Sequence, residues 1–232
     1  MMSNPEQAIL SNTELLKKSK EILSANYSKV MLPFFLVFLV QVILQNSQEF
    51  YGLLFNNYGL YSAITYGIIS FIYISLATIG LASFGLHIAR EEGFEKNKLL
   101  EGFKVFQKVL AVTLVYFLVI FIGFLLLIIP GIVLSIMFSQ VYFLILKTPE
   151  KSVPELFKES ALLMKGYKWQ LFIMYIRFGF FLILSAFTLF IWSLWLIPQY
   201  YTAFALFYEM ISSNRIVSGV NHLKGDVVND QE

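Results

Sequence analysis

Long apolar stretches alternate with shorter polar ones along most of the chain. Several of them approach the roughly 20 residues that a helix needs to cross the hydrocarbon core of a bilayer, which is about 30 Å thick. The pattern predicts an all-α integral membrane protein in which six transmembrane helices pair as three hairpins. The predicted spans are residues 30–44, 64–89, 110–129, 132–146, 169–191 and 195–211.

The basic residues are confined to alternate connections between these spans. Four lie in the N-terminal segment, five in the second connection, five in the fourth and two in the tail, whereas the first, third and fifth connections contain none. Segments rich in lysine and arginine stay on the cytoplasmic side of a membrane. We therefore expect a multi-pass topology in which the N- and C-termini are both cytoplasmic.

The chain divides into three regions on this basis. Residues 1–29 are predicted to form a cytoplasmic amphipathic N-terminal helix, and residues 30–211 a six-helix transmembrane domain. Residues 212–232 are polar, lack a periodic apolar face and are expected to be a flexible cytoplasmic tail. The composition agrees with a membrane protein, because 58% of the residues are hydrophobic and only 14% are charged.

The N-terminal segment carries the signals of an amphipathic helix. Capping boxes that begin at Ser3 and Ser11 can each open it, since a hydroxyl and a carboxylate three residues later satisfy free amides of a first turn. Ile9, Leu16 and Leu23 then recur every seven residues. The helix is expected to lie on the membrane surface, and the alternative is a helix docked on the rest of the protein.

Two further cytoplasmic connections show similar features. Residues 90–108 hold apolar residues at helical spacing among charged ones, which favours another surface helix. The connection from 147 to 168 contains a capping box at Ser152 and Glu155, and Gly166 is placed to end the helix.

Pro130 and Gly131 separate the third and fourth spans. A Pro-Gly pair does not continue a helix cleanly. Because no charged residue lies near this pair, we expect a tight hairpin that turns here, at the outer surface.

Two spans carry small residues along one helix face. Helices in lipid associate through close backbone approach, because apolar contacts alone are no better than contacts with acyl chains. Each small-residue face is therefore predicted to pack against a neighbouring helix. The residues are Ser75, Thr78, Ala82, Gly85 and Ala89 in the second span, and Gly131, Ser135 and Ser139 in the fourth.

The polar pair Ser139–Gln140 lies near the middle of the fourth span. Hydrogen bonding to another helix is the expected role of polar groups at this depth. A path for a substrate is the alternative.

Arg177 is the one basic residue inside an apolar stretch, about 12 Å beyond Trp169 along a helix. If the fifth and sixth spans turn near Ser193, Arg177 lies level with Met210 and beside Glu209. An unpaired charge at this depth costs a few kcal/mol or more. We therefore expect an Arg177–Glu209 ion pair that faces the bundle. The alternatives are that Arg177 extends to the inner headgroups, or that it serves transport or a proton relay.

Sequence motifs of catalysis and cofactor binding are absent. The chain contains no cysteine, no Gly-rich phosphate loop, no His-Glu-x-x-His and no Gly-x-Ser-x-Gly. We expect no enzymatic activity, no cofactor and no metal site. The net charge of +2 is too small to indicate nucleic-acid binding. The expected partners are the lipid bilayer and either another membrane protein or a second copy of the chain.

Several short motifs, taken in order, are similar to those of one protein family. They are Gly102-Phe103-Lys104, the LLLIIPG stretch 125–131, the stretch 160–168 and Phe207-Tyr208-Glu209. Together they resemble the domain of unknown function 975 family of bacterial integral membrane proteins, which is itself similar to the membrane domain of some glycerophosphodiester phosphodiesterases. The resemblance covers roughly residues 15–211 and implies six helices in a bacterial plasma membrane. It implies no activity, and Arg177 departs from the family pattern.

Two classes of function follow from these observations. The first is a non-enzymatic membrane protein that acts as an accessory, scaffold or immunity-type partner. The second is a small transporter or lipid-handling protein. A cavity that reaches the middle of the membrane would favour the second class.

Overall fold

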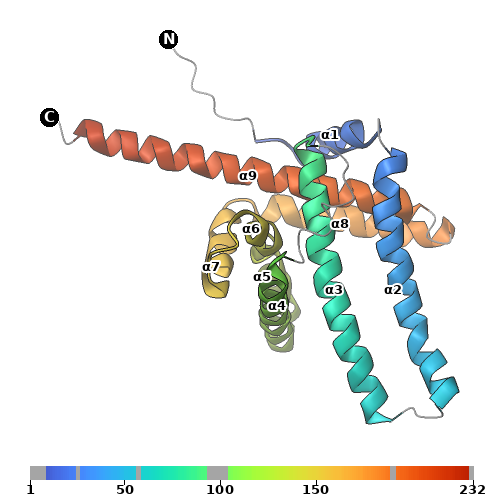
Figure 1. The fold of residues 1–232 in the computed structure, drawn as a ribbon. Coiled ribbons are helices and arrows are strands. Elements are labelled where there is room, and N and C mark those ends of the chain that lie inside the picture. The colour runs from blue at the N-terminus through green and yellow to red at the C-terminus, as the bar shows by residue number, and fades with distance from the viewer. Residues whose placement is uncertain (1–8, 25–26, 56–58, 93–103, 189–191, 230–232) are drawn as a thin grey trace.

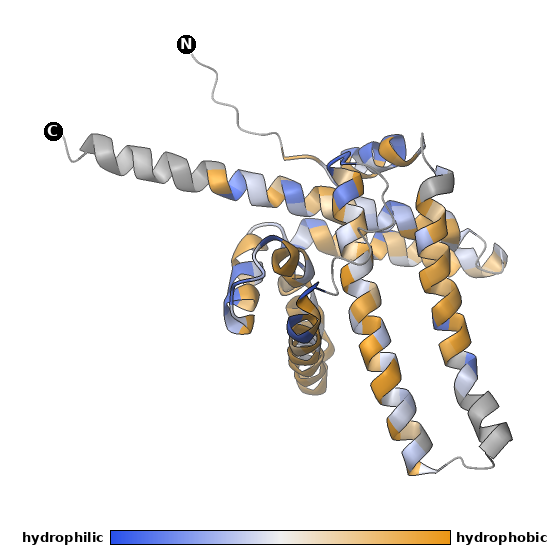
Figure 2. Cartoon of the chain, viewed as in Figure 1, coloured by the Kyte–Doolittle hydropathy of each residue, from blue (hydrophilic) through white to orange (hydrophobic). Residues whose placement is uncertain are grey.

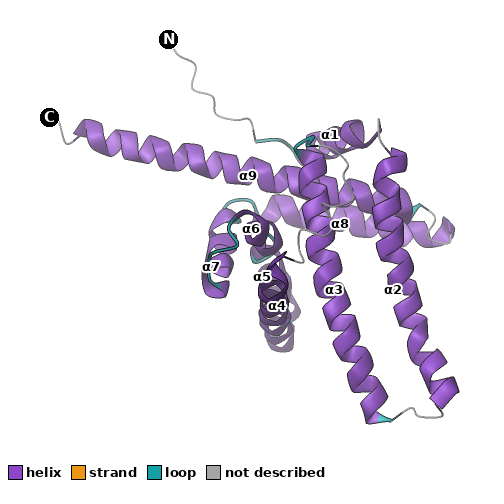
Figure 3. Cartoon of the chain, viewed as in Figure 1, coloured by secondary structure: helices purple, strands orange, loops and turns teal. Residues whose placement is uncertain are grey.

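The computed structural model describes residues 9–24, 27–55, 59–92, 104–188 and 192–229 (Figure 1). Within these ranges the chain forms helices and short turns, without a strand (Figure 3). The predicted all-α fold is therefore confirmed for this part of the chain. The helices are α1 (Asn12–Ser24), α2 (Tyr27–Phe55), α3 (Leu60–Ala89), α4 (Phe106–Leu126), α5 (Ile128–Met137), α6 (Val141–Lys147), α7 (Val153–Leu163), α8 (Lys168–Ser185), the 3-10 turn η2 (Ala186–Thr188) and α9 (Ser193–Asn229).

Several of these helices are long and apolar enough to cross a membrane. The four such segments among the described residues are Ala63–Ala89, Phe106–Leu126, Ile128–Lys147 and Lys168–Thr188. Helix α2 adds the shorter apolar stretch Val30–Leu44, and apolar residues colour much of α2 and α3 orange in Figure 2. The chain is a membrane protein.

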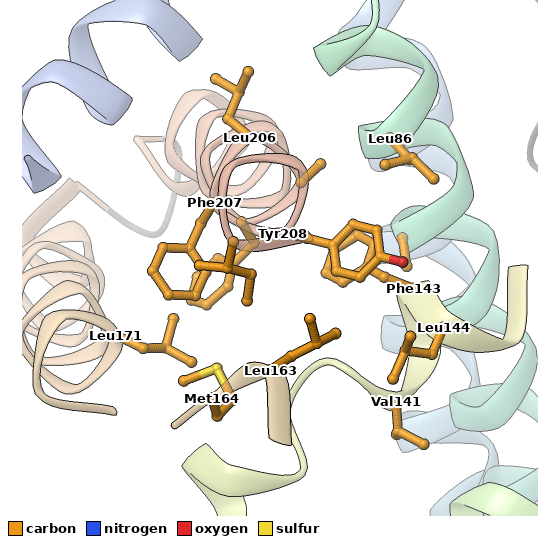
Figure 4. Close-up of a cluster of buried hydrophobic side chains, with 14 of the residues drawn as sticks. Leu86, Val141, Phe143, Leu144, Leu163, Met164, Leu171, Leu206, Phe207 and Tyr208 are labelled. Atoms are coloured by element: carbon orange, nitrogen blue, oxygen red, sulfur yellow. The ribbon is translucent and has the colours of Figure 1, made fainter. Parts of the chain in front are cut away.

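Helix α9 is the centre of the packing. It contacts α1, α2, α3, α7 and α8. Residues 203–208 are all buried, so this segment of α9 has no side that faces lipid or water. The rings of Phe207 and Tyr208 lie among Leu163, Leu171 and other buried side chains of α6 to α8 (Figure 4). Residues 203–208 of the last helix are therefore enclosed by the other helices.

The helical hairpins are not parallel to one another. Helices α2 and α3 run alongside each other, and α8 and α9 run across them (Figure 1). Helices α4 and α5 form a close pair of their own. Since crossing helices touch over short lengths only, spaces remain between the hairpins on both sides of the crossing.

Helix α1 docks on α9 instead of lying alone on a membrane surface. Leu15 and Leu23 are fully buried, and Ser19 between them is buried as well. Ile9, which was expected on the apolar face, is exposed. The buried face of α1 packs on α9 and on the α2–α3 pair, as the docked alternative describes, and the position of α1 relative to the membrane surface stays a prediction.

The two predicted capping boxes within the described residues are formed. The amide of Ser11 donates to the Glu14 carboxylate over 2.7 Å, and that of Ser152 donates to Glu155 over the same distance. The serine hydroxyl in each box also lowers the pKa of its glutamate, because it stabilises the charged form. The box predicted at Ser3 lies outside the described residues, as does most of the predicted surface helix 90–108.

The turn between α4 and α5 lies at Leu127, so its predicted position at Pro130 and Gly131 is wrong. Leu127 is extended, and its amide donates to the Gly123 carbonyl over 3.1 Å. Pro130 falls in the first turn of α5, where its missing amide hydrogen breaks no helical hydrogen bond. Gly131 allows a close contact instead, because a Cβ there would lie 2.5 Å from the ring of Phe124.

Some helices extend beyond their predicted ends. Helix α2 reaches Phe55 and α3 begins at Leu60, which shortens the predicted first loop. Helix α9 continues to Asn229, so the tail predicted to be flexible is helical. A helix that has already formed adds further residues at small free-energy cost, even where no apolar face requires it.

Candidate functional site

Two cavities of similar size open between the helices. The first, which we call the α2 cavity, measures about 510 Å³ and lies between α2, α3, α8 and α9. The second, the α4 cavity, measures about 520 Å³ and lies between α3, α4, α8, α9 and the junction of α5 with α6. Volumes in this range are typical of sites for small molecules. Aromatic and aliphatic side chains form most of both linings.

A group of shared residues, the tyrosine wall, separates the two cavities. It consists of Tyr175 from α8, Tyr200 and Tyr201 from α9, and Ile74 and Thr78 from α3, all of which line both cavities. The ring centres of Tyr175 and Tyr200 are 6.3 Å apart, and those of Tyr200 and Tyr201 are 5.8 Å apart. The wall therefore offers hydroxyl groups to spaces that are otherwise apolar.

The fourth predicted span is broken beside the α4 cavity. Helix α5 ends at Met137 and α6 begins at Val141, with a turn between them. A continuous helix was expected here, since the sequence has no glycine or proline at the break. The backbone amide of Gln140 leaves the helical pattern and donates to the Ser160 hydroxyl of α7 over 3.2 Å. Non-helical backbone inside a membrane is tolerated where protein groups satisfy it in this way.

The break carries a polar seam made of Ser139, Gln140 and Ser160. Ser160 Oγ donates to the Met137 carbonyl over 3.0 Å, and Gln140 Nε2 donates to Ser139 Oγ over 2.9 Å. Ser139 lines the α4 cavity and interacts with the Tyr175 hydroxyl. Gln140 is fully buried, and its Oε1 has no hydrogen-bond partner among the described residues. The polar seam thus connects the broken helix to the tyrosine wall.

A third cavity, the Arg177 cavity, measures about 380 Å³ and lies where α1, α8, α9 and the start of α2 meet. Two cationic side chains, Arg177 and Lys20, line it together with the amide of Gln199. Aromatic rings form much of the remaining wall, and the ring centres of Tyr27 and Trp195 are 6.5 Å apart. The lining contains no aspartate or glutamate.

The structure does not bring Arg177 and Glu209 together, so the predicted ion pair is wrong. Glu209 Oε1 accepts hydrogen bonds from Arg90 Nη2 over 2.7 Å and from Arg90 Nε over 2.9 Å. Within the described ranges, Arg177 has neither an ion pair nor a hydrogen bond.

The register of the α8–α9 hairpin explains this difference. Phe178 packs edge-to-face on Tyr200, with ring centres 4.4 Å apart, because α8 ends at Ser185 and not at residue 191. Arg177 is therefore about level with Tyr201 and Thr202 of α9. Glu209 lies seven residues further along, which is about 10 Å at 1.5 Å per residue.

Contacts also join the connections that carry the basic residues. Lys108 donates to backbone carbonyls of the connection between α6 and α7. The Arg90–Glu209 pair ties the end of α3 to α9, and Asn12 Nδ2 donates to the carbonyl of Gln170 at the start of α8 over 2.8 Å. The segments predicted to be cytoplasmic are thus linked to one another.

The region that holds the broken span and most of the tyrosine wall matches a known family model. The model, described as "Protein of unknown function (DUF975)", covers residues 114–215. Residues 114–215 are thus similar to the DUF975 family. No curated protein and no solved structure matches the chain.

The DUF975 region runs from α4 into α9 and includes the polar seam and Arg177. The family predicted from the short motifs is therefore confirmed for this region. The predicted similarity upstream of residue 114 lies outside the match, and the relation to the membrane domain of glycerophosphodiester phosphodiesterases is not shown.

The small residues of α3, which precede the DUF975 region, occupy several environments. Gly85 lies at the closest approach to α9, where an added Cβ would be 3.0 Å from a backbone oxygen. Thr78 lines both cavities, and Ala82 lines the α4 cavity. Ser75 is buried and donates to a carbonyl of its own helix, whereas Ala89 is partly buried.

The small residues of the broken span, within the DUF975 region, face α4 and α8. Gly131 lies against the ring of Phe124, and the Ser135 carbonyl accepts a hydrogen bond from the Tyr116 hydroxyl over 3.3 Å. Ser139 belongs to the polar seam. This face therefore closes the α4–α5 hairpin and borders the α4 cavity.

Proposed function

We propose that this chain is a non-enzymatic, multi-pass protein of the bacterial plasma membrane that binds a lipid in the cavities between its helices. The observation that carries the proposal is the pair of cavities, each of about 500 Å³, on the two sides of the tyrosine wall. Both are lined in part by α3 and α8, which are long and apolar enough to cross a bilayer.

The linings favour a lipid over a polar solute. A polar solute or an ion must recover its lost hydration through several polar groups. In the α2 cavity these are limited to hydroxyls and the amide of Gln41, with no charged side chain. An acyl chain needs no such groups, and aromatic and aliphatic side chains provide its dispersion contacts. The tyrosine hydroxyls can bind the polar linkage of a lipid.

The topology belongs to the same proposal. The distribution of lysine and arginine supports cytoplasmic termini, with α2 to α6 crossing the bilayer as two hairpins. Helices α8 and α9 lie across the cytoplasmic ends of α2 and α3 in this arrangement, because the α8–α9 turn is beside the start of α2, with the ring centres of Trp195 and Tyr27 6.5 Å apart.

Single cysteines test this topology cleanly, because the natural chain has none. A membrane-impermeant thiol reagent added to intact cells should label Leu127→Cys in the turn between α4 and α5, and should leave Lys158→Cys in α7 and Thr188→Cys after α8 unlabelled. Labelling of Lys158→Cys from outside would refute the topology. Labelling of Thr188→Cys from outside would mean that α8 and α9 cross the bilayer as a third hairpin.

Lipid binding is tested by filling the α2 cavity from Gly179. An added Cβ at this position meets no atom within 4 Å, so Gly179→Leu can place its side chain in the cavity. Gly67→Leu is the matched control, since Gly67 is also helical, is exposed on α3 and has equally open surroundings. Lipid retained by purified protein is extracted and quantified by mass spectrometry. We expect less lipid with Gly179→Leu and an unchanged amount with Gly67→Leu.

Equal retention by the two variants would contradict lipid binding in this cavity. A fixed protein partner that co-purifies with a lipid-free chain would instead favour the accessory or scaffold role.

A further inference from the structure

We infer that the Arg177 cavity binds the phosphate headgroup of an anionic phospholipid whose acyl chain lies in the α2 cavity. The inference rests on the proposed lipid binding and specifies the class of lipid. Three features of the described residues support it. The Arg177 cavity carries positive charge without an acidic residue in its wall, it is lined by aromatic side chains, and it lies next to the apolar α2 cavity.

The first feature is the charge. Arg177 and Lys20 come from different helices and line one cavity that has no acidic residue in its wall. Neither side chain forms an ion pair within the described ranges. Positive charge beside an apolar helix is unfavourable unless an anion compensates it. A phosphate supplies that anion, and the planar guanidinium can donate two parallel hydrogen bonds to it.

The second feature places the cavity at headgroup depth. Tyr27, Trp192 and Trp195 surround the two cations. Tyrosine and tryptophan gather where the hydrocarbon of a membrane meets its headgroups. The polar helix α1 forms one side of the cavity, and Gln199 Nε2 donates to the carbonyl of Leu16 in α1 over 3.4 Å.

The third feature is that the Arg177 cavity and the α2 cavity are adjacent. Phe178 and Leu196 line both the Arg177 cavity and the α2 cavity. The cationic space therefore borders directly on the apolar one. A molecule with a phosphate at one end and a hydrocarbon chain at the other occupies both. Free phosphate would fill only the first, and it would leave the apolar lining without an occupant.

The test uses the purified full-length chain in a neutral detergent. Native mass spectrometry measures its binding of phosphatidylglycerol, of phosphatidylcholine with the same acyl chains, and of inorganic phosphate. One charge-assisted hydrogen bond corresponds to about tenfold in affinity, so phosphatidylglycerol should bind at least about tenfold more tightly than phosphatidylcholine. Inorganic phosphate should not displace it at equal concentration.

Charge-removing variants then locate the headgroup. Arg177→Gln should reduce the preference for phosphatidylglycerol by about tenfold, and Lys20→Gln should reduce it by a smaller factor. Lys18→Gln is the matched control, because Lys18 is an exposed lysine of the same helix that does not line the cavity. It should leave the preference unchanged. Lys20 is exposed, so its replacement keeps the test available if Arg177→Gln does not fold.

The outcomes separate this inference from the proposal beneath it. Binding of both lipids without a headgroup preference, or a preference that survives both replacements, overturns the headgroup assignment alone. Displacement by inorganic phosphate at equal concentration would identify a free-phosphate site and also overturn it. If neither lipid binds and Gly179→Leu changes nothing, lipid binding itself fails.

Discussion

Replacing Gly85 with alanine tests the closest contact between α3 and the central helix. The added Cβ would lie 3.0 Å from the Tyr201 carbonyl oxygen and 3.2 Å from its carbonyl carbon. These atoms belong to the backbone of α9, so no side-chain rotation can relieve the contact. The two helices must separate by a few tenths of an ångström, or α9 must shift within its fully buried surroundings.

Two opposing effects set the change in the free energy of unfolding for Gly85→Ala. Alanine favours a helix over glycine by about 1 kcal/mol. Overpacking of a close contact costs about 1–3 kcal/mol. Gly67 lies in the same helix and has no atom within 4 Å of an added Cβ, so Gly67→Ala contains the first effect alone. Gly85→Ala should therefore be about 1–3 kcal/mol less stable than Gly67→Ala.

The assay is reversible unfolding of both variants and the natural chain in mixed micelles of a mild detergent and an increasing fraction of sodium dodecyl sulfate. Helicity and tryptophan fluorescence should report the same transition. If Gly85→Ala stabilises the protein as much as Gly67→Ala does, α3 and α9 do not approach this closely and the packing argument is refuted.

Three further predictions concern other contacts. The stability losses of Arg90→Gln and Glu209→Gln should be non-additive, with a coupling of about 0.2–1 kcal/mol for a partly exposed pair, whereas those of Arg177→Gln and Glu209→Gln should be additive. Unfolding of the single and double variants measures both couplings. A coupling between Arg177 and Glu209 would support the pairing predicted from the sequence. Pro130→Ala should change stability by less than about 0.5 kcal/mol, because Pro130 lies in a first turn, and a larger loss in the same assay would place the turn there after all. Ser152→Ala should lower the thermal midpoint near neutral pH. The Ser152 hydroxyl lowers the pKa of Glu155, so the part of the loss that depends on the charged carboxylate is full above the ordinary carboxyl pKa and disappears as the pH falls through the lower pKa of the folded chain. A loss that is equally large in strong acid would contradict this contribution.

The helices could be predicted because their signals are local. Long apolar runs specify membrane helices with little dependence on the rest of the chain. The capping box at Ser152 and the stop at Gly166, which has a φ of +91°, depend on a few neighbouring residues only. The family was predictable for a similar reason, since its motifs are short and ordered along the chain.

The position of a turn was harder to predict where one residue type has two uses. Pro130 is as acceptable in the first turn of a helix as in a hairpin turn, so it could not distinguish the two. The exposed apolar residue Leu127 forms the turn without any turn-favouring residue. Nothing in its local sequence indicates this.

The predicted partner of Arg177 depended on the register between α8 and α9. The predicted end of α8 was six residues too late. This error shifts the pairing of residues between α8 and α9, so that Glu209 was predicted to lie beside Arg177. The true partner of Glu209, Arg90, comes from a distant helix that crosses α9. Spacing along the chain contains no signal for such a contact.

Some signals for the cavities are visible in the sequence. Ser139 and Gln140 marked the polar seam, although no proline or glycine indicated the break between α5 and α6. The adjacent Tyr200 and Tyr201 were visible as aromatic residues of one span. Their role in separating two cavities arises only because α3, α8 and α9 cross.

The burial of α9 has a consequence for biogenesis. About 180 residues separate the end of α1 from the buried segment of α9 on which it docks, which is about 10–40 s of translation at about 5–20 residues per second. By the end of that interval the first two hairpins have been made, but the helix that holds them together has not yet been synthesised. A ribosome stalled before residue 193 would therefore leave a membrane-inserted intermediate with its future interior open to acyl chains, as a substrate for insertion chaperones and membrane proteases.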